Sequence, residues 1–138
     1  MTIQKRIAVL GAGQIGVIIA GMLAEQGHQV TLADASAAQL KHAADGRFAT
    51  ETVDAANLDA LRAFLKDRDI VVSACPYFLN KGIAKVAAET KTHYFDLTED
   101  VATTAYIKEL AETADIALAP QCGLAPGFLH EGRVAAAS

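Results

Sequence analysis

The run Gly11-Ala12-Gly13-Gln14-Ile15-Gly16 constrains the fold of this chain more than any other feature. The apolar residues 7–10 precede it with a pattern typical of a buried strand, and helical spacing follows over residues 15–26. Glycines at this spacing between a strand and a helix form the fingerprint of a dinucleotide-binding turn. A tight turn that binds no ligand can have the same spacing. The prediction therefore depends on the strand before the run and the helix after it.

Each position in the run has a separate expected role. Gly11 permits the tight turn, Gly13 lets a pyrophosphate approach the backbone, and Gly16 lets the helix pack closely on the strand. The backbone N–H groups around Gln14 and Ile15 would then point at phosphate oxygens, at the positive end of the helix. These five residues are the expected phosphate-binding part of the site.

Short apolar runs alternate with helical periodicity along the rest of the chain. The expected strands are residues 7–10, 30–33, 48–53, 70–73, 93–96 and 116–119. Ser36 and Asn57 suit helix N-caps, and Gly27 suits a left-handed C-cap. Strands that alternate with helices predict an α/β fold, with a doubly wound parallel six-stranded sheet of Rossmann type in three αβα layers. With no linker or repeat, we expect one domain over residues 1–138.

The composition excludes several classes of protein. Hydrophobic residues make up 52 % of the chain, which argues against disorder. The net charge is 12 − 16 = −4, which argues against a nucleic-acid partner. Glycines interrupt the apolar residues 7–24, so neither a signal peptide nor a membrane span is expected. Two cysteines suit a reducing cytoplasm, and without a spaced set of histidines they do not indicate a metal site.

Acidic residues follow the second and third expected strands. Asp34 comes 23 residues after Gly11, where an acid binds the 2′-hydroxyl of the adenosine ribose. Its charge would repel a 2′-phosphate, and no Lys or Arg occurs in residues 35–37, so NAD is expected rather than NADP. Asp34 could instead only cap the next helix. Asp54 is a candidate for adenine contact, and equally a solvated turn residue.

The segment after the fourth strand is the expected nicotinamide side of the site, because ligands lie beyond the carboxyl ends of such strands. Small residues at Ala74 and Cys75 would let the nicotinamide ribose lie against the backbone, and Pro76 stiffens the loop. Tyr77 is a candidate hydrogen-bond donor or acid, or an aromatic residue packed under the loop.

Two further candidates follow the fifth and sixth strands. Asp96 could hold a substrate ammonium group or relay a proton. Cys122 is either a small buried hydrophobic residue or a group facing the nicotinamide.

Four segments carry a family resemblance: Gly-Ala-Gly-Gln-Ile-Gly at 11–16, Cys-Pro-Tyr-Phe at 75–78, Tyr-Phe-Asp-Leu at 94–97 and Gly-Leu-Ala-Pro-Gly-Phe at 123–128. In this order they resemble the cofactor domain of the saccharopine dehydrogenase family. The resemblance implies NAD(P)-dependent oxidation of an amine carbon, or the reverse reductive amination, on a small amino acid or amine. It also implies that Tyr77, Asp96 and Cys122 lie near the substrate.

Members of that family continue into a substrate domain, whereas this sequence has 138 residues. We therefore expect either a fragment or a stand-alone cofactor module that binds NAD without turnover. A homodimer is the expected assembly if the chain associates with itself. The alternative is a nucleotide-sensing regulatory domain of the potassium-transport type, which binds NAD or ATP without catalysis. Tyr77 and Lys81 have the spacing of a short-chain reductase pair, but they fall directly after a strand rather than on the long helix.

Overall fold

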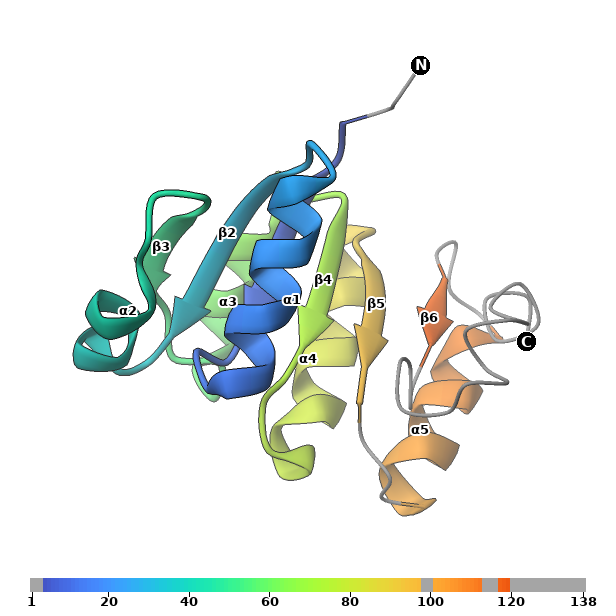
Figure 1. Ribbon diagram of the computed structural model, residues 1–138. Coiled ribbons are helices and arrows are strands. Elements are labelled where there is room, and N and C mark those ends of the chain that lie inside the picture. Colours follow the sequence, from blue (N-terminus) through green and yellow to red (C-terminus); the bar gives the residue numbers. More distant parts are fainter. Residues whose placement is uncertain (1–3, 98–100, 113–116, 120–138) are drawn as a thin grey trace.

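The computed structural model describes residues 4–97, 101–112 and 117–119. Within them, strands and helices alternate without exception (Figure 1). The strands are β1 (Arg6–Leu10), β2 (Gln29–Asp34), β3 (Ala49–Thr52), β4 (Ile70–Ser73), β5 (His93–Asp96) and β6 (Leu118–Ala119). The helices are α1 (Gln14–Glu25), α2 (Ala37–Ala43), α3 (Leu58–Leu65), α4 (Tyr77–Thr90) and α5 (Val101–Ala111).

The strands form one sheet in the order β3-β2-β1-β4-β5-β6, and every neighbouring pair is parallel. The chain builds the sheet outward from β1 to β3, crosses back through α3, and then builds outward from β4 to β6. The order therefore reverses between β1 and β4, which is the position where such sheets bind their ligands. The predicted doubly wound α/β fold is confirmed.

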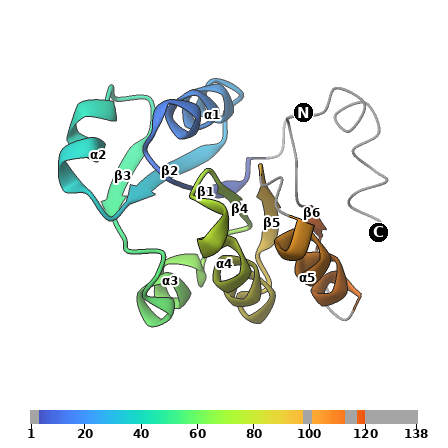
Figure 2. The ribbon, with the colours of Figure 1, turned by 90° about the horizontal axis from the view of Figure 1, so that it is seen from below.

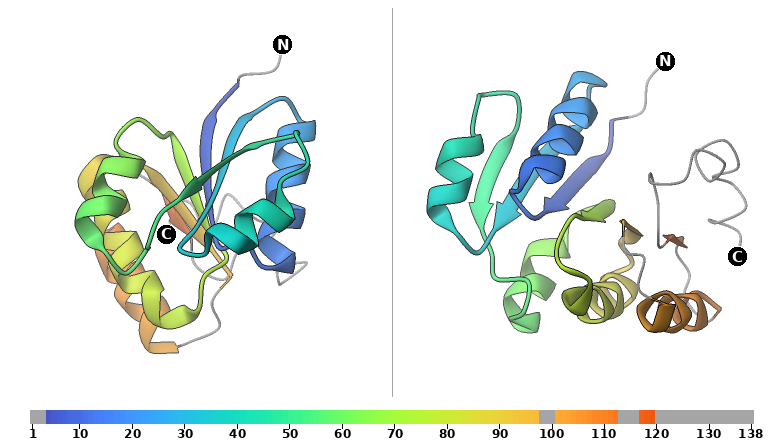
Figure 3. Two further views of the ribbon diagram at one scale, coloured as in Figure 1. Left: turned by 90° about the vertical axis from the view of Figure 1, so that its left-hand side faces the viewer. Right: turned by 60° about the horizontal axis from the view of Figure 1, so that its bottom comes forward.

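Helices cover both faces of the sheet. Helices α1 and α2 lie on one face, over the half that contains β1, β2 and β3, whereas α3, α4 and α5 lie side by side on the other face (Figure 2; Figure 3, left). All strands run in the same direction, so the carboxyl ends of β1, β2 and β4 lie at the same end of the sheet as the start of α1. Figure 1 shows this arrangement for β2, β4 and α1.

The alternation of side chains in β1 explains why both faces must be covered. Ile7 and Val9 pack into the apolar cluster beneath α1 and α2. Ala8 and Leu10 pack into the cluster beneath α3, α4 and α5. All four are nearly inaccessible to solvent. A strand that is apolar at every position is stable only inside such a three-layer structure.

Local signals in the sequence set several helix ends. The Ser36 hydroxyl accepts a hydrogen bond from the Gln39 N–H at 3.2 Å, and Asn57 caps α3 through the Ala60 N–H at 3.2 Å. Gly27 follows α1 with φ of 93°, and its N–H donates to the Ala24 carbonyl. Both predicted N-caps and the predicted left-handed glycine are therefore confirmed.

Two local expectations need adjustment. The third strand was expected over residues 48–53, but β3 covers only Ala49–Thr52, and all four of its residues are exposed because it lies at the edge of the sheet. The apolar helical spacing over residues 15–26 favours a buried helix, yet Ile15, Ile18 and Met22 of α1 are each more than half exposed. No helix within the described residues is long and apolar enough to cross a membrane.

Candidate functional site

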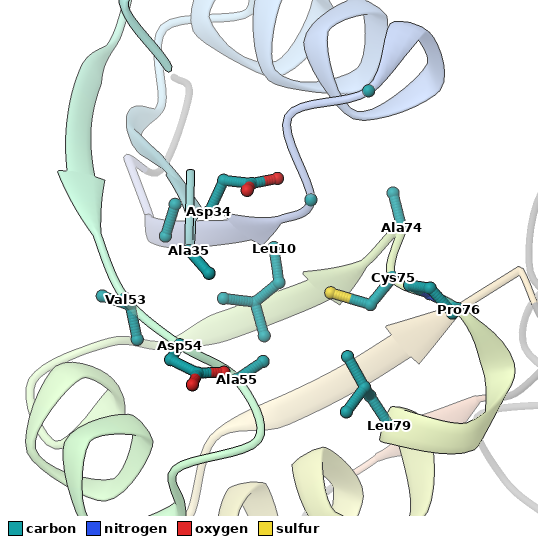
Figure 4. A pocket seen from close by; sticks show the side chains of 13 residues that line it. Leu10, Asp34, Ala35, Val53, Asp54, Ala55, Ala74, Cys75, Pro76 and Leu79 are labelled. Carbon is teal, nitrogen blue, oxygen red and sulfur yellow. The ribbon is translucent and has the colours of Figure 1, made fainter. Parts of the chain in front are cut away.

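A pocket of about 320 Å³ lies at the carboxyl ends of the strands, at the point where the strand order reverses (Figure 4). Four segments form it, one from the end of each of β1 to β4. Its walls consist of Leu10, Gly11, Gly13, Ala33, Asp34, Ala35, Val53, Asp54, Ala55, Ala74, Cys75, Pro76 and Leu79. The walls are mainly apolar with two carboxylates at different points, and the volume falls in the range of small-molecule sites.

The glycine turn has the three properties that the spacing predicts. Gly11 has φ of 102°, and a Cβ on it would lie 2.8 Å from the Ala74 carbonyl oxygen. A Cβ on Gly16 would lie only 1.7 Å from the Gly11 carbonyl oxygen. Gly13, by contrast, has no heavy atom within 4 Å of the same position, so it faces open space. Two of the glycines therefore permit close packing, and the third leaves room above the turn.

The first backbone N–H groups of α1 receive no acceptor from a capping side chain or from an acidic residue in the first turn. Gly13 is the N-cap residue and contributes no side-chain hydrogen bond, and the first turn of α1 contains no acidic residue. The first N–H groups of a helix need outside acceptors and carry a partial positive charge. This arrangement suits a phosphate group, and the open side of Gly13 is where it would be accommodated.

Asp34 stands at the end of β2 beside this turn (Figure 4). Its Oδ2 accepts a hydrogen bond from the Ala12 N–H at 2.7 Å, and its Oδ1 accepts one from the Ser36 N–H at 2.8 Å. A carboxylate has about four acceptor positions, so two remain for a ribose hydroxyl. The alternative reading of Asp34, as the cap of α2, does not hold because Ser36 caps that helix.

A buried polar pair shapes the segment between β4 and α4. The Ser73 hydroxyl donates to Asn80 Oδ1 at 2.7 Å, and it accepts the Cys75 N–H at 3.3 Å. Both Ser73 and Asn80 are 1 % exposed. They hold the backbone of residues 74–76 against the turn, so that Cys75 points into the pocket (Figure 4). Burial raises the pKa of the Cys75 thiol to about 11, so this thiol is neutral at physiological pH.

The structure brings together seven of the ten residues predicted to bind the cofactor, namely Gly11, Gly13, Asp34, Asp54, Ala74, Cys75 and Pro76. The other three, Gln14, Ile15 and Gly16, begin α1 directly behind the glycine turn. Asp54 lies in the turn after β3, where its carboxylate also accepts the Ala56 N–H at 2.9 Å.

The three residues expected near a substrate have different surroundings. Tyr77 is the first residue of α4, next to Pro76 of the pocket, and is 55 % exposed. Asp96, at the end of β5, is completely buried, and the Tyr94 hydroxyl donates to it. Cys122 lies outside the described residues. Neither Tyr77 nor Asp96 lines the pocket.

Sequence reasoning missed two groups of residues at this site. The apolar walls at Leu10, Val53 and Leu79 could have been found from their positions at the ends of β1, β3 and the start of α4. The Ser73–Asn80 pair has no local signal, because seven residues and a loop separate the two side chains.

A nicotinamide dinucleotide fits these features by the chemistry of its parts. The turn offers backbone donors and an open glycine to a pyrophosphate, Asp34 offers acceptor positions to a ribose, and the apolar walls offer surface to a base. Within the described ranges, no group of three or more metal-binding side chains occurs.

The sequence matches the family model of the saccharopine dehydrogenase NADP binding domain over residues 7–122. The chain belongs to this family. It is therefore a nicotinamide-dinucleotide-binding domain of the oxidoreductase type, and the predicted family is confirmed.

Relatives and solved structures agree with this membership. The saccharopine dehydrogenase (L-Glu forming) of Saccharomyces cerevisiae superposes with a TM-score of 0.78 at 27 % identity, over 94 % of this chain and 30 % of that chain. The mitochondrial alpha-aminoadipic semialdehyde synthase of Rattus norvegicus is 26 % identical over 137 residues, covering 94 % of this chain and 14 % of the synthase.

A second dehydrogenase is similar to part of this chain. A glycerol-3-phosphate dehydrogenase of Limosilactobacillus reuteri, whose name specifies NAD(P)+, is 34 % identical over 92 residues. The match covers 62 % of this chain and 26 % of that enzyme. The saccharopine dehydrogenase-type domain thus spans about a quarter or less of these curated relatives.

Proposed function

We propose that this domain binds NAD in preference to NADP and serves as the cofactor domain of an oxidoreductase that acts on the C–N bond of a small amino acid or amine. The observation that carries the cofactor preference is the Asp34 carboxylate in the pocket wall, with no Lys or Arg among the residues that line the pocket. A 2′-phosphate beside Asp34 would meet a negative charge and no basic partner. The family model is named for NADP, so the preference for NAD is a specific test of this chain.

The proposed reaction class rests on the family. Saccharopine dehydrogenase and alpha-aminoadipic semialdehyde synthase, which this chain resembles, carry amino-acid substrates in their names. When bound, the nicotinamide ring supplies hydride transfer, and this chain binds and orients the dinucleotide. Ala74, Cys75 and Pro76 would lie along its nicotinamide half, and exposed Tyr77 is the residue best placed to face a substrate.

We further propose that residues 1–138 act as a single cofactor-binding domain whose turnover of an amine needs residues beyond the pocket described. The support is that the chain corresponds to only 30 % of the yeast saccharopine dehydrogenase chain. Binding of the dinucleotide and negligible amine dehydrogenase activity of this chain alone are the expected results. Efficient oxidation of lysine or saccharopine by the 138-residue chain would contradict this part of the proposal.

Calorimetric titration of the chain with NADH, NADPH and ATP tests the cofactor. We expect NADH to bind at least tenfold more tightly than NADPH, because a hydrogen bond between a carboxylate and a ribose hydroxyl contributes about 1.5 kcal/mol. The variant Asp34→Ala should lose this discrimination. Asp59→Ala removes a fully exposed carboxylate on α3 and is the matched control. Tight binding of ATP without a preference for nicotinamide ligands would favour the nucleotide-sensing alternative.

A further inference from the structure

The Asp34 carboxylate makes two hydrogen bonds that involve no ligand. One is to the Ala12 N–H, in the middle of the glycine turn, and the other is to the Ser36 N–H, after the end of β2. We propose that Asp34 is a positioning residue that holds the glycine turn in its binding shape, in addition to any contact with a ribose. This inference concerns the pocket of the proposed function and rests on it for the identity of the ligand.

Ala12 shows why this contact matters to the turn. The residue is 3 % exposed and lies between Gly11 and Gly13, and its N–H points at the Asp34 carboxylate. The preceding N–H, of Gly11, donates to the Ala33 carbonyl at 2.8 Å. Two successive amides of the turn are therefore tied to the end of β2. The next N–H groups belong to the first turn of α1, where no side chain caps them.

Only a carboxylate can make both contacts. Each of its two oxygens accepts a different backbone N–H, at 2.7 and 2.8 Å. An asparagine has one oxygen and one NH₂ group, so in either orientation one backbone N–H would face another donor. Asp34→Asn should therefore release either Ala12 or Ser36, although its size is nearly unchanged.

The same geometry couples cofactor preference to the shape of the turn. A substitution at position 34 that removes the charge, as a change of preference to NADP requires, also removes the acceptor of the Ala12 N–H. Changing this one residue should therefore weaken binding of both dinucleotides, instead of exchanging one preference for the other.

Amide hydrogen exchange of the ligand-free full chain tests the inference without any cofactor. In Asp34→Asn we expect the Ala12 amide to exchange at least tenfold faster, while amides of β1 such as Val9 keep their rates. Asp54→Asn is the matched control, because it makes the same charge change in the same pocket, while the carboxylate that it alters accepts from the Ala56 N–H and not from Ala12. Its Ala12 amide should exchange as in the unsubstituted chain. Unchanged Ala12 exchange in Asp34→Asn would overturn the inference.

Binding of ADP and 2′-deoxy-ADP separates the two roles of Asp34. If Asp34 acted only on the 2′-hydroxyl of the ribose, Asp34→Asn would weaken ADP but leave 2′-deoxy-ADP unchanged, and that result would overturn the inference. We expect 2′-deoxy-ADP to bind about tenfold more weakly to Asp34→Asn than to the unsubstituted chain. If neither nucleotide binds the unsubstituted chain, the proposed function fails, and the exchange experiment still decides the role of Asp34. Should Asp34→Asn not fold, Asp34→Ser replaces it, with the same expected exchange.

Discussion

The Tyr94 hydroxyl donates a hydrogen bond to Asp96 Oδ2 at 2.5 Å, and both side chains are completely buried. They leave β5 on the same face of the sheet, two residues apart, beneath the helices α4 and α5. Asp96 is thus a member of a polar pair inside the core, although its position at the end of a strand resembles that of a ligand-binding residue.

Tyr94→Phe should lower the free energy of unfolding by about 1–3 kcal/mol, because the variant leaves a buried carboxyl group without this partner. Urea unfolding at neutral pH measures the change. A substitution of Tyr106, which is only partly buried on α5, to Phe is the control and should have little effect. Equal effects of the two substitutions would show that the Tyr94–Asp96 contact contributes nothing.

The pair also predicts a loss of stability at high pH. Burial is the largest cause that raises the pKa of Tyr94 above its usual value near 10, and the neighbouring Asp96 raises it further. Above about pH 10 the unfolded chain gives up this proton while the folded chain keeps it, so stability falls as the pH rises. Unfolding free energies between about pH 9 and pH 11 should therefore fall more steeply for the unsubstituted chain than for Tyr94→Phe. Parallel profiles would contradict the expectation.

Gly13 and Gly16 should respond differently to the same substitution. Gly16→Ala places a Cβ 1.7 Å from the Gly11 carbonyl oxygen, which should cost about 3 kcal/mol of stability. Gly13→Ala meets nothing within 4 Å and should change stability by less than about 1 kcal/mol. It should nevertheless weaken dinucleotide binding about tenfold or more, because the Cβ occupies the space for the pyrophosphate. Thermal unfolding and calorimetry measure the two effects, and tight binding by Gly13→Ala would place the phosphates elsewhere.

Asn80→Leu should destabilise the chain by about 1–3 kcal/mol, because the buried Ser73 hydroxyl loses its acceptor. Replacing both partners in Ser73→Ala/Asn80→Leu should recover part of the loss, since no unpaired polar group is then left from this contact. Urea unfolding of the two single variants and the double variant forms the cycle. Strict additivity would show that the two side chains do not interact.

Cys75 should react slowly with iodoacetamide at neutral pH, because only the thiolate reacts and burial raises the pKa of this thiol to about 11. In a Cys122→Ser background, the alkylation rate should still be rising above about pH 10, where the rate of an ordinary cysteine levels off. Urea-unfolded protein gives the ordinary profile as the control. A bound dinucleotide should slow the reaction further, and an unchanged rate would show that the ligand does not cover Cys75.

The fold and the glycine turn could be predicted because their signals are local. A strand, three glycines and a helix follow one another within about twenty residues, and the caps at Ser36 and Asn57 act within one helical turn. The position of Asp34 could be predicted for the same reason, since it ends the next strand.

Contacts between distant segments could not be predicted in this way. The tie from Asp34 to Ala12 depends on the pairing of Leu10 with Ala33, which brings the ends of β1 and β2 together. Asp96 lies in the core because its side chain shares a face with Tyr94. In the sequence, its position at the end of a strand favours a ligand-binding role. The burial of its side chain depends on the helices packed against that face, which the sequence does not show locally.

The absence of a side chain at Gly11 has a mechanical consequence. At this position the turn after β1 and the segment after β4 are so close that even a methyl group could not fit between them. The two segments cannot come closer together, and the Ala74 N–H, which donates to the Leu10 carbonyl at 2.8 Å, opposes their separation. The two pocket walls that would contact the two halves of a dinucleotide are thus in direct contact at Gly11, and any larger residue there would have to push them apart.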